Sequence, residues 1–232
     1  WKRHKWPAIK KSPKIGAHIA FLDESGFMLI PTRRRTWGPQ GCTPIVRYNY
    51  RHDRISAIAA MTVASKRARM GLYVQCRQDN FKAPQVAKFL RLLLKHLRGH
   101  VLLIWDGGTI HKGPHIRAVQ DAYPRLHLER FPTYAPELNP AEQVWNDFKR
   151  HTGNSILRGK QDIRLNLHGM PAESGALLTN SAHSYLPRIF RPRHGSSVSI
   201  TYAKVYSGAM KRLRFTSSSG YLPPATAPEL SL

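Results

Sequence analysis

The sequence predicts an α/β domain built on a mixed sheet flanked by helices. Short apolar stretches bounded by turn residues are typical of strands, other segments repeat apolar residues at helical spacing, and the two kinds alternate along the chain. With 232 residues, 41% of them hydrophobic, the chain is long enough to bury the core of one domain. We expect residues 17–154 to form this domain.

The strands are predicted from the apolar stretches. Residues 17–22 form the first strand, which we expect to end at Asp23 in a turn that reaches Gly26. The stretch 101–105 is entirely apolar and precedes Asp106, which is typical of a strand buried on both faces. Further strands or hairpin arms are expected at 35–38, 44–50, 55–63, 71–76 and 126–131.

Two helices are predicted from periodicity, and the alternation implies another between the strands at 101–105 and 126–131. The clearest covers residues 84–97, with Pro84 in its first turn and Gly99 beyond its end. The second runs from Asn139, as N-cap, to about residue 150. Its buried face is expected to include Ala141, Val144, Trp145 and Phe148. Trp37 is expected to be another core anchor.

The two flanking segments lack such periodicity. Residues 1–16 contain six Lys or Arg, two Pro and no acid, so we expect a basic linker. Residues 155–232 are expected to form an irregular basic tail, because 21 of the 62 residues from 171 onward are Ser, Pro or Gly.

Charge restricts the function. Lys and Arg number 37 against 13 Asp and Glu, and the net charge of +24 favours a polyanionic partner, nucleic acid before an anionic membrane surface. No apolar stretch approaches the roughly 20 residues of a membrane span, and the basic start does not resemble a signal peptide. The two cysteines cannot form a disulfide framework or a four-ligand zinc site. We therefore expect a cytoplasmic protein associated with the nucleoid.

Three acidic side chains are candidate functional groups. Asp23 and Asp106 each follow an apolar strand directly, and sites in open α/β sheets form at the carboxyl ends of strands. Asp is also common as an ordinary turn residue. Glu142 is the third residue of its helix, where it can complete a capping box or point towards Asp23 and Asp106. The residues alone leave both roles open for each acid.

Taken together, the three acids favour a metal site. Clustered carboxylates repel one another unless cations hold them, and oxygen ligands without His or Cys select Mg²⁺ or Mn²⁺. Two such ions about 4 Å apart can activate a nucleophile and stabilise the leaving oxygen in phosphodiester displacement. A basic chain with such a cluster is typical of an enzyme that processes DNA or RNA.

Four sequence blocks carry a family resemblance. They are LDESGF at 22–27, TWGPQGCTP at 36–44, WDGGTIHKG at 105–113 and YAPELNPAEQVWNDFK at 134–149. In their order, and in the 35 residues that separate Asp106 from Glu142, they resemble the Asp-Asp-Glu (DDE) transposases. More narrowly, they resemble the bacterial insertion-sequence six-thirty branch, which is related to mariner elements. The resemblance covers about residues 1–154.

The resemblance implies a ribonuclease-H-like catalytic domain whose metal ligands are Asp23, Asp106 and Glu142, and it selects Asp23 over its neighbour Glu24. The implied activity is that of a DNA endonuclease and strand transferase that uses two Mg²⁺ or Mn²⁺ ions at transposon ends. Double-stranded DNA and a second copy of the chain are the implied partners. The alternatives are a nuclease without strand transfer and an inactive transposase remnant that binds DNA only through its charge.

Two features depart from the family pattern. No helix-turn-helix region precedes the catalytic domain, and the segment after residue 154 differs from the usual helical ending. We interpret these departures as a coding region truncated at its start and frame-shifted near its end.

Basic residues supply candidate phosphate contacts. His111, five residues after Asp106, can contact the scissile phosphate, position the catalytic Asp or be an ordinary turn residue, and the sequence leaves these roles open. The candidates for DNA contact are Arg33, Arg34, Arg35, Lys66, Arg67, Arg69, His111 and Lys112.

Overall fold

The computed structural model describes residues 1, 3–12, 16–28, 35, 37–42, 45, 54–64, 69–153, 159–163, 198–206 and 209–217. Its strands are β1 (His18–Met28), β2 (Arg54–Val63), β3 (Arg69–Arg77), β4 (Val101–Trp105), β5 (Leu126–Arg130), β6 (Val198–Tyr206) and β7 (Ala209–Ser217). Its α-helices are α1 (Lys5–Lys11), α2 (Ala83–His96), α3 (Pro114–Ala122) and α4 (Pro140–His151). Short 3₁₀ helices η2 (Thr109–His111) and η3 (Pro136–Leu138) lie in the connections.

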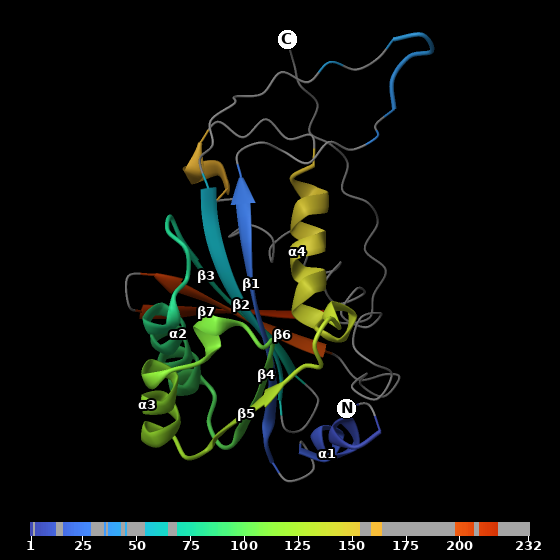
Figure 1. Cartoon of the computed structure of the whole chain (residues 1–232). Helices are drawn as coiled ribbons and strands as arrows, with labels where there is room; N and C mark the ends of the chain where they lie inside the picture. Colours follow the sequence, from blue (N-terminus) through green and yellow to red (C-terminus); the bar gives the residue numbers. More distant parts are fainter. Residues whose placement is uncertain are drawn as a thin grey trace.

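The strands form one mixed sheet in the order β5-β4-β1-β2-β3-β6-β7 (Figure 1). Strands β1, β2 and β3 are antiparallel neighbours, whereas β4 and β5 run parallel to β1. Helix α3 connects β4 to β5, as a parallel pair requires a crossover. The mixed sheet flanked by helices, predicted from the sequence, is confirmed.

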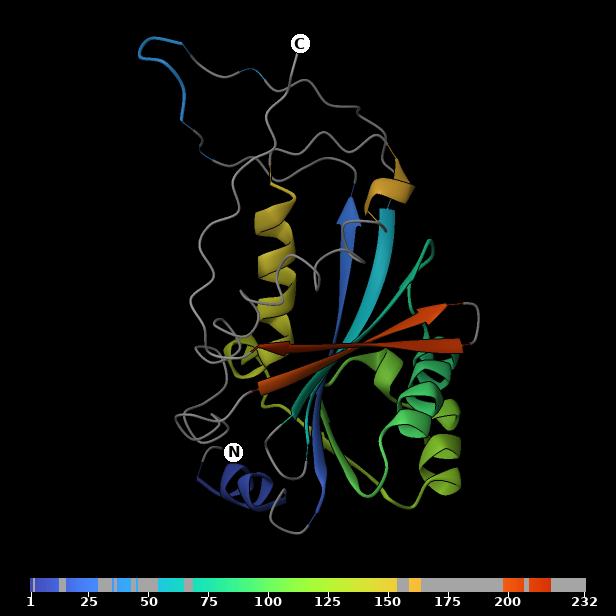
Figure 2. The same ribbon diagram turned by 180° about the vertical axis from the view of Figure 1, so that it is seen from behind.

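Helices cover the sheet on both faces (Figures 1 and 2). On one face, Leu22 and Leu103 belong to the same buried cluster as Phe89 of α2. On the other face, Phe27 contacts Trp145 and Phe148 of α4. All five residues of β4 are buried, so the prediction of a strand covered on both faces is confirmed.

The first strand is longer than the sequence predicted. Strand β1 continues through Asp23 and Gly26 to Met28, so the turn expected at 23–26 is wrong. The backbone pairs throughout with β2, with Asp23 opposite Ala59 and Gly26 opposite Ser56. Because side chains alternate along a strand, Asp23 and Glu24 point to opposite faces of the sheet.

The flanking segments also contain regular structure that was not predicted from the sequence. Within the expected linker, α1 buries Ile9 to 3% exposure, and Trp1 stacks on Trp6 beside the same cluster. Within the expected irregular tail, β6 pairs in parallel with β3, and β7 pairs with β6. The hairpin β6–β7 runs across the direction of β1 and β2 (Figure 2).

Few of the residues expected to form the hairpin arms are described. Arg35, Trp37 and Gly38 lie outside regular structure, and the stretch 44–50 falls outside the described residues except for Ile45. Trp37 is 99% exposed, so its prediction as a core anchor is wrong, whereas Trp145 is buried as predicted. None of the helices described is both long and apolar enough to cross a membrane.

Candidate active site

The three predicted acids line one cavity of about 560 Å³, called here the acidic cavity. Asp23 comes from β1, Asp106 follows β4 directly, and Glu142 lies in the first turn of α4. Strands β1 and β4 are parallel neighbours in which Phe21 pairs with Ile104, so the two Asp residues, each two positions further on, lie at the same level. Lys112 and Arg130 also line this cavity.

The start of α4 places Glu142 beside β1. The side chain of Asn139 accepts a hydrogen bond from the Ala141 N–H at 3.1 Å, so Asn139 is the N-cap that the sequence predicted. Its Nδ2 donates to the carbonyl oxygen of Leu22 at 3.4 Å, which ties the helix start to the strand that carries Asp23. Among the hydrogen bonds of these described residues, Glu142 makes no capping box with Asn139, so its carboxylate remains available to the cavity.

Asp23 lies in an environment that disfavours its charge. Burial, followed by the nearby carboxylates of Glu142 and Glu24, raises the pKa of Asp23 to about 7. The indole N–H of Trp145 donates to Asp23 Oδ2 at 2.8 Å and opposes this effect without cancelling it. A cation bound beside Asp23 would favour its ionised form.

Asp106 lies in the opposite kind of environment. Its Oδ1 is 2.7 Å from His111 Nδ1 and accepts a hydrogen bond from the Gly108 N–H at 2.9 Å. The contact with His111 lowers the pKa of Asp106 below its ordinary value. Burial disfavours the charged ring of His111, but its hydrogen bonds with Asp106 and Glu24 outweigh burial and raise its pKa to about 9.

The predicted DNA-contact residues are only partly described. Arg33, Arg34, Lys66 and Arg67 lie outside the described residues, Arg35 is exposed, and Arg69 begins β3. Lys112 is exposed at the rim of the acidic cavity. His111 is only 3% exposed and faces carboxylates on both edges of its ring.

Two partners of the acids were not predicted from the sequence. Glu24 was weighed only as a rival of Asp23, although the two-residue period of β1 places it on the face of Leu22, towards His111. Trp145 was predicted as a core anchor, and its indole N–H also donates to Asp23. A buried Trp next to a polar strand residue is the signal for such a bond, because a buried indole N–H usually finds an acceptor.

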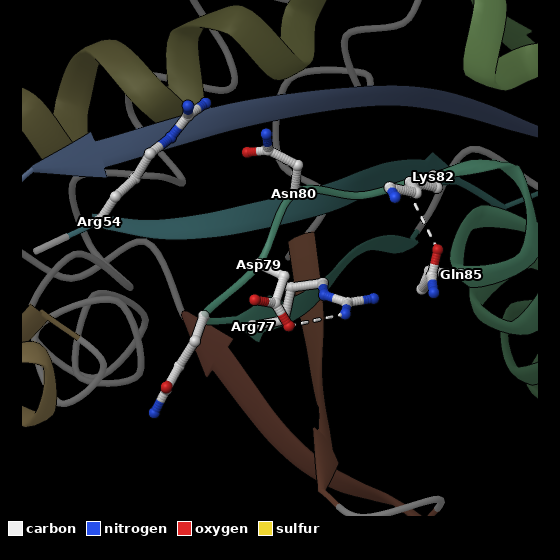
Figure 3. A pocket seen from close by; sticks show the side chains of 7 residues that line it. Arg54, Arg77, Asp79, Asn80, Lys82 and Gln85 are labelled. Carbon is white, nitrogen blue, oxygen red and sulfur yellow. Dashed lines mark hydrogen bonds and ion pairs between the residues drawn. The ribbon is translucent and has the colours of Figure 1, made fainter.

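A second cavity, of about 520 Å³, contains basic side chains and is called here the basic cavity (Figure 3). Arg77 forms an ion pair with Asp79 at 3.2 Å in its middle, while Arg54 and Lys82 lie on either side. The guanidinium of Arg54 covers Gly26, where a Cβ would come within 2.7 Å of its nitrogens. The lining thus has three cations against one acid.

The three acids share a cavity without forming a closed set of ligands. Among the residues that the structure describes, no three His, Cys, Asp or Glu side chains are arranged to hold a metal ion as they stand. The side chain of Asp106 is 61% exposed. A shared metal site therefore requires side-chain rotation within the cavity.

A protein-family model described as DDE superfamily endonuclease matches residues 18–164. No curated protein sequence matches the chain. Among solved structures, the Mos1 transposase paired-end complex with left transposon end matches with a TM-score of 0.49 and 12% identity, over 77% of this chain and 58% of that one. The catalytic domain of Mos1 mariner transposase matches with a TM-score of 0.43 and 9% identity, over 77% and 86%. The chain thus spans about three fifths of the Mos1 chains in the DNA complexes.

Proposed function

The chain belongs to the DDE superfamily endonuclease family, and from this premise we propose that it is the catalytic domain of a transposase that cuts and joins DNA at transposon ends. The family match confirms the resemblance seen in the four sequence blocks. One observation carries the proposal: Asp23, Asp106 and Glu142, far apart in the sequence, line a single cavity within the matched region.

The donor set fits a hard divalent cation. All three candidate ligands are carboxylates, which suits Mg²⁺ or Mn²⁺, and Asp23 lies where a cation would favour its ionised form. Asp23, Asp106 and Glu142 would hold the two ions. When bound, such ions activate the attacking oxygen and stabilise the leaving oxygen of a phosphodiester. Crystal structures of the Mos1 mariner paired-end complex with Mg and with Mn support this choice.

The proposed reaction is two successive in-line displacements. Water attacks the phosphorus at the transposon end, the bond to the 3′ oxygen breaks, and that oxygen leaves as a 3′-hydroxyl after taking up a proton. The 3′-hydroxyl then attacks a phosphodiester of target DNA, loses its proton and forms the new strand joint. The target phosphorus gives up its bond to the target's own 3′ oxygen, which takes up a proton and leaves as a 3′-hydroxyl. Lys112 and Arg130 line the cavity and would bind phosphates that flank the reacting one.

Double-stranded DNA is the proposed partner, held mainly through its phosphates. The net charge of +24 and the basic cavity with Arg54, Arg77 and Lys82 support this part of the proposal. Acting on chromosomal DNA places the protein at the nucleoid in the cytoplasm. A homodimer that brings two DNA ends together completes the proposal, and the paired-end complexes of Mos1 support it.

The second candidate is an inactive remnant that only binds DNA. The observation that favours it is the open arrangement of the acids, since no three of the described side chains form a closed ligand set. The two candidates predict the same DNA binding and differ in the chemistry.

A plasmid-nicking assay separates the two candidates. We expect the full chain to nick supercoiled plasmid in Mg²⁺ or Mn²⁺ and not in EDTA, and Asp106→Asn to lower the rate by at least about a thousandfold, since a bound metal supplies several kcal/mol of transition-state stabilisation. DNA binding should be unchanged in the variant. Metal-dependent nicking that survives Asp106→Asn would exclude this site, and no nicking by the wild type would favour the remnant.

A further inference from the structure

One carboxylate beside the acidic cavity has no part in the proposed chemistry. Glu24 follows Asp23 in β1 but points to the other face of the sheet, where α2 and α3 lie. Its side chain is 18% exposed, and its Oε1 is 3.0 Å from His111 Nε2. A carboxylate with so little exposure needs a hydrogen-bonding partner. That partner is His111, which also contacts Asp106.

The ring of His111 is held on both edges and on one face. Nδ1 lies 2.7 Å from Asp106 Oδ1 and Nε2 lies 3.0 Å from Glu24 Oε1, while the ring stacks on Trp105 with centroids 4.4 Å apart and planes within 7°. Carboxylate oxygens only accept hydrogen bonds, so each ring nitrogen donates towards its acid. Trp105 belongs to the fully buried strand β4, and the ring therefore has a rigid support.

These contacts decide how Asp106 presents its carboxylate. Asp106 lies outside regular structure and its side chain is 61% exposed, which would ordinarily leave its rotamer free. Oδ1, however, contacts both His111 and the Gly108 N–H. With Oδ1 engaged in this way, Oδ2 is the oxygen left to face the acidic cavity.

We propose that Glu24 and His111 are a positioning pair, in which Glu24 anchors the ring of His111 and the ring fixes Asp106 so that one oxygen is offered to the metal. The inference rests on the proposed function and goes beyond it, because it assigns Glu24 and His111 to neither DNA contact nor metal ligation. Hydrogen-bond partners of metal ligands typically contribute 10–100-fold to metal affinity or activity, which sets the expected size of the effect.

Two substitutions of the ring separate its two contacts. In His111→Asn the amide lies near the position of Nδ1 and can still donate to Asp106, but it no longer reaches Glu24. In His111→Gln the amide lies near the position of Nε2, so the contact with Glu24 is kept and the one with Asp106 is lost. A purely structural role would depend on lost packing, which is similar in the two variants.

The measurement is Mn²⁺ binding to the full chain without DNA, by calorimetric titration, with thermal melts of each variant in EDTA. We expect His111→Gln to weaken binding 10–100-fold, and Glu24→Gln and His111→Asn to weaken it by a smaller but measurable factor of about two to ten. Asp106→Asn shows how much Mn²⁺ affinity remains when the metal site is lost. His115→Asn, at an exposed position on α3, is the matched control that should bind Mn²⁺ like the wild type.

The outcomes distinguish the positioning pair from the metal site itself. If the wild type binds Mn²⁺ no better than Asp106→Asn, the proposed function fails first. If Asp106→Asn loses binding while both His111 variants keep wild-type affinity, the positioning pair is overturned. It is also overturned if Glu24→Gln loses as much affinity as Asp106→Asn, because Glu24 would then be a ligand. Should His111→Gln fail to fold, wild-type affinity in both Glu24→Gln and His111→Asn would still overturn it.

Discussion

Asp23 and Glu24 are neighbours in the sequence but lie in opposite electrostatic surroundings. Asp23 points towards α4, where Glu142 adds a second negative charge and the direct partner is the neutral Trp145. Glu24 points towards α2 and α3, where His111 meets it and Asp106 together. The negative charges on the α4 face of β1 therefore have no positive partner among the described residues, whereas those on the opposite face meet the ring of His111.

The difference shows where a cation is needed. Glu24, which lies outside the acidic cavity, is already stabilised by the charged ring of His111, so it suits a supporting role. A buried carboxylate next to another acid is costly in its ionised form, and a divalent cation removes that cost. The face with Asp23 and Glu142 is therefore where binding of a metal would be coupled most strongly to stability.

The largest expected effect comes from removing the uncompensated charge. Asp23→Asn should lower the nicking rate by at least about a thousandfold, because a metal ligand is lost. The same change should raise the free energy of unfolding without metal at pH 8 by up to about 4 kcal/mol, from a pKa shift of roughly three units. Nicking and denaturant unfolding, measured on one preparation, check both effects. A variant that loses activity together with stability would contradict the contrast between the two faces.

The next effect is a pH dependence of the free energy of unfolding, which should change over two pH ranges, called here the lower and the upper window. Folding raises the pKa of Asp23 from 3.8 to about 7, so the folded protein holds that proton more tightly and stability without metal falls as pH rises from about 4 to 7. Folding also raises the pKa of His111 from 6.5 to about 9, so the stability it contributes is complete below pH 6.5 and is lost towards pH 9.

Unfolding in EDTA across pH 4–9 measures both windows. Asp23→Asn should flatten the lower window and leave the upper one. Glu24→Gln should reduce mainly the upper one, with a smaller reduction of the lower one because Glu24 also helps to raise the pKa of Asp23. A single window that both variants change equally would mean that the two faces are not electrostatically separate.

Metal should stabilise the wild type by an intermediate amount. At a free Mg²⁺ or Mn²⁺ concentration a hundred times the dissociation constant, the gain is about 2.7 kcal/mol, visible as a rise in melting temperature of several degrees. Asp106→Asn should lose this shift, and Asp121→Asn, which removes an exposed charge on α3, should keep it. A shift of equal size in both variants would indicate that the ions bind elsewhere.

The sequence predicted those elements whose own residues carry the pattern. Strand β4 and helices α2 and α4 appeared near their predicted bounds because apolar periodicity is local. Strand β1 was predicted too short because the polar stretch from Asp23 to Gly26 is held extended by pairing with residues of β2 that lie 30 to 36 positions further along the chain. Hairpin β6–β7 was missed because its strands lie in a segment whose average composition favours loops.

The candidate site follows the same rule. Asp23, Asp106 and Glu142 could be selected from the sequence because each follows or opens a recognisable element and the family resemblance joins them. The contact between Glu24 and His111 spans 87 residues and has no local signature. The basic cavity likewise forms through register, with Arg77 opposite Ser56, and none of its cations belongs to a basic run.

The smallest expected effect concerns the basic cavity. We expect this cavity to bind DNA phosphates, whereas the acidic cavity carries the chemistry. Arg54→Gln combined with Lys82→Gln removes two cations that line it without a carboxylate partner among the described residues. If both contact DNA phosphates, the slope of log affinity against log salt should become shallower by about 1.8, at roughly 0.9 per contact.

The matched control is Lys88→Gln combined with Lys95→Gln. It removes the same charge from exposed positions on α2 that line neither cavity, so it should change the slope less. Filter binding of a random duplex at several salt concentrations measures the slopes, and equal slopes for the two pairs would show that the basic cavity is not a phosphate contact. Nicking at saturating DNA should stay within a few fold of the wild type in both pairs, because the acids of the other cavity are untouched.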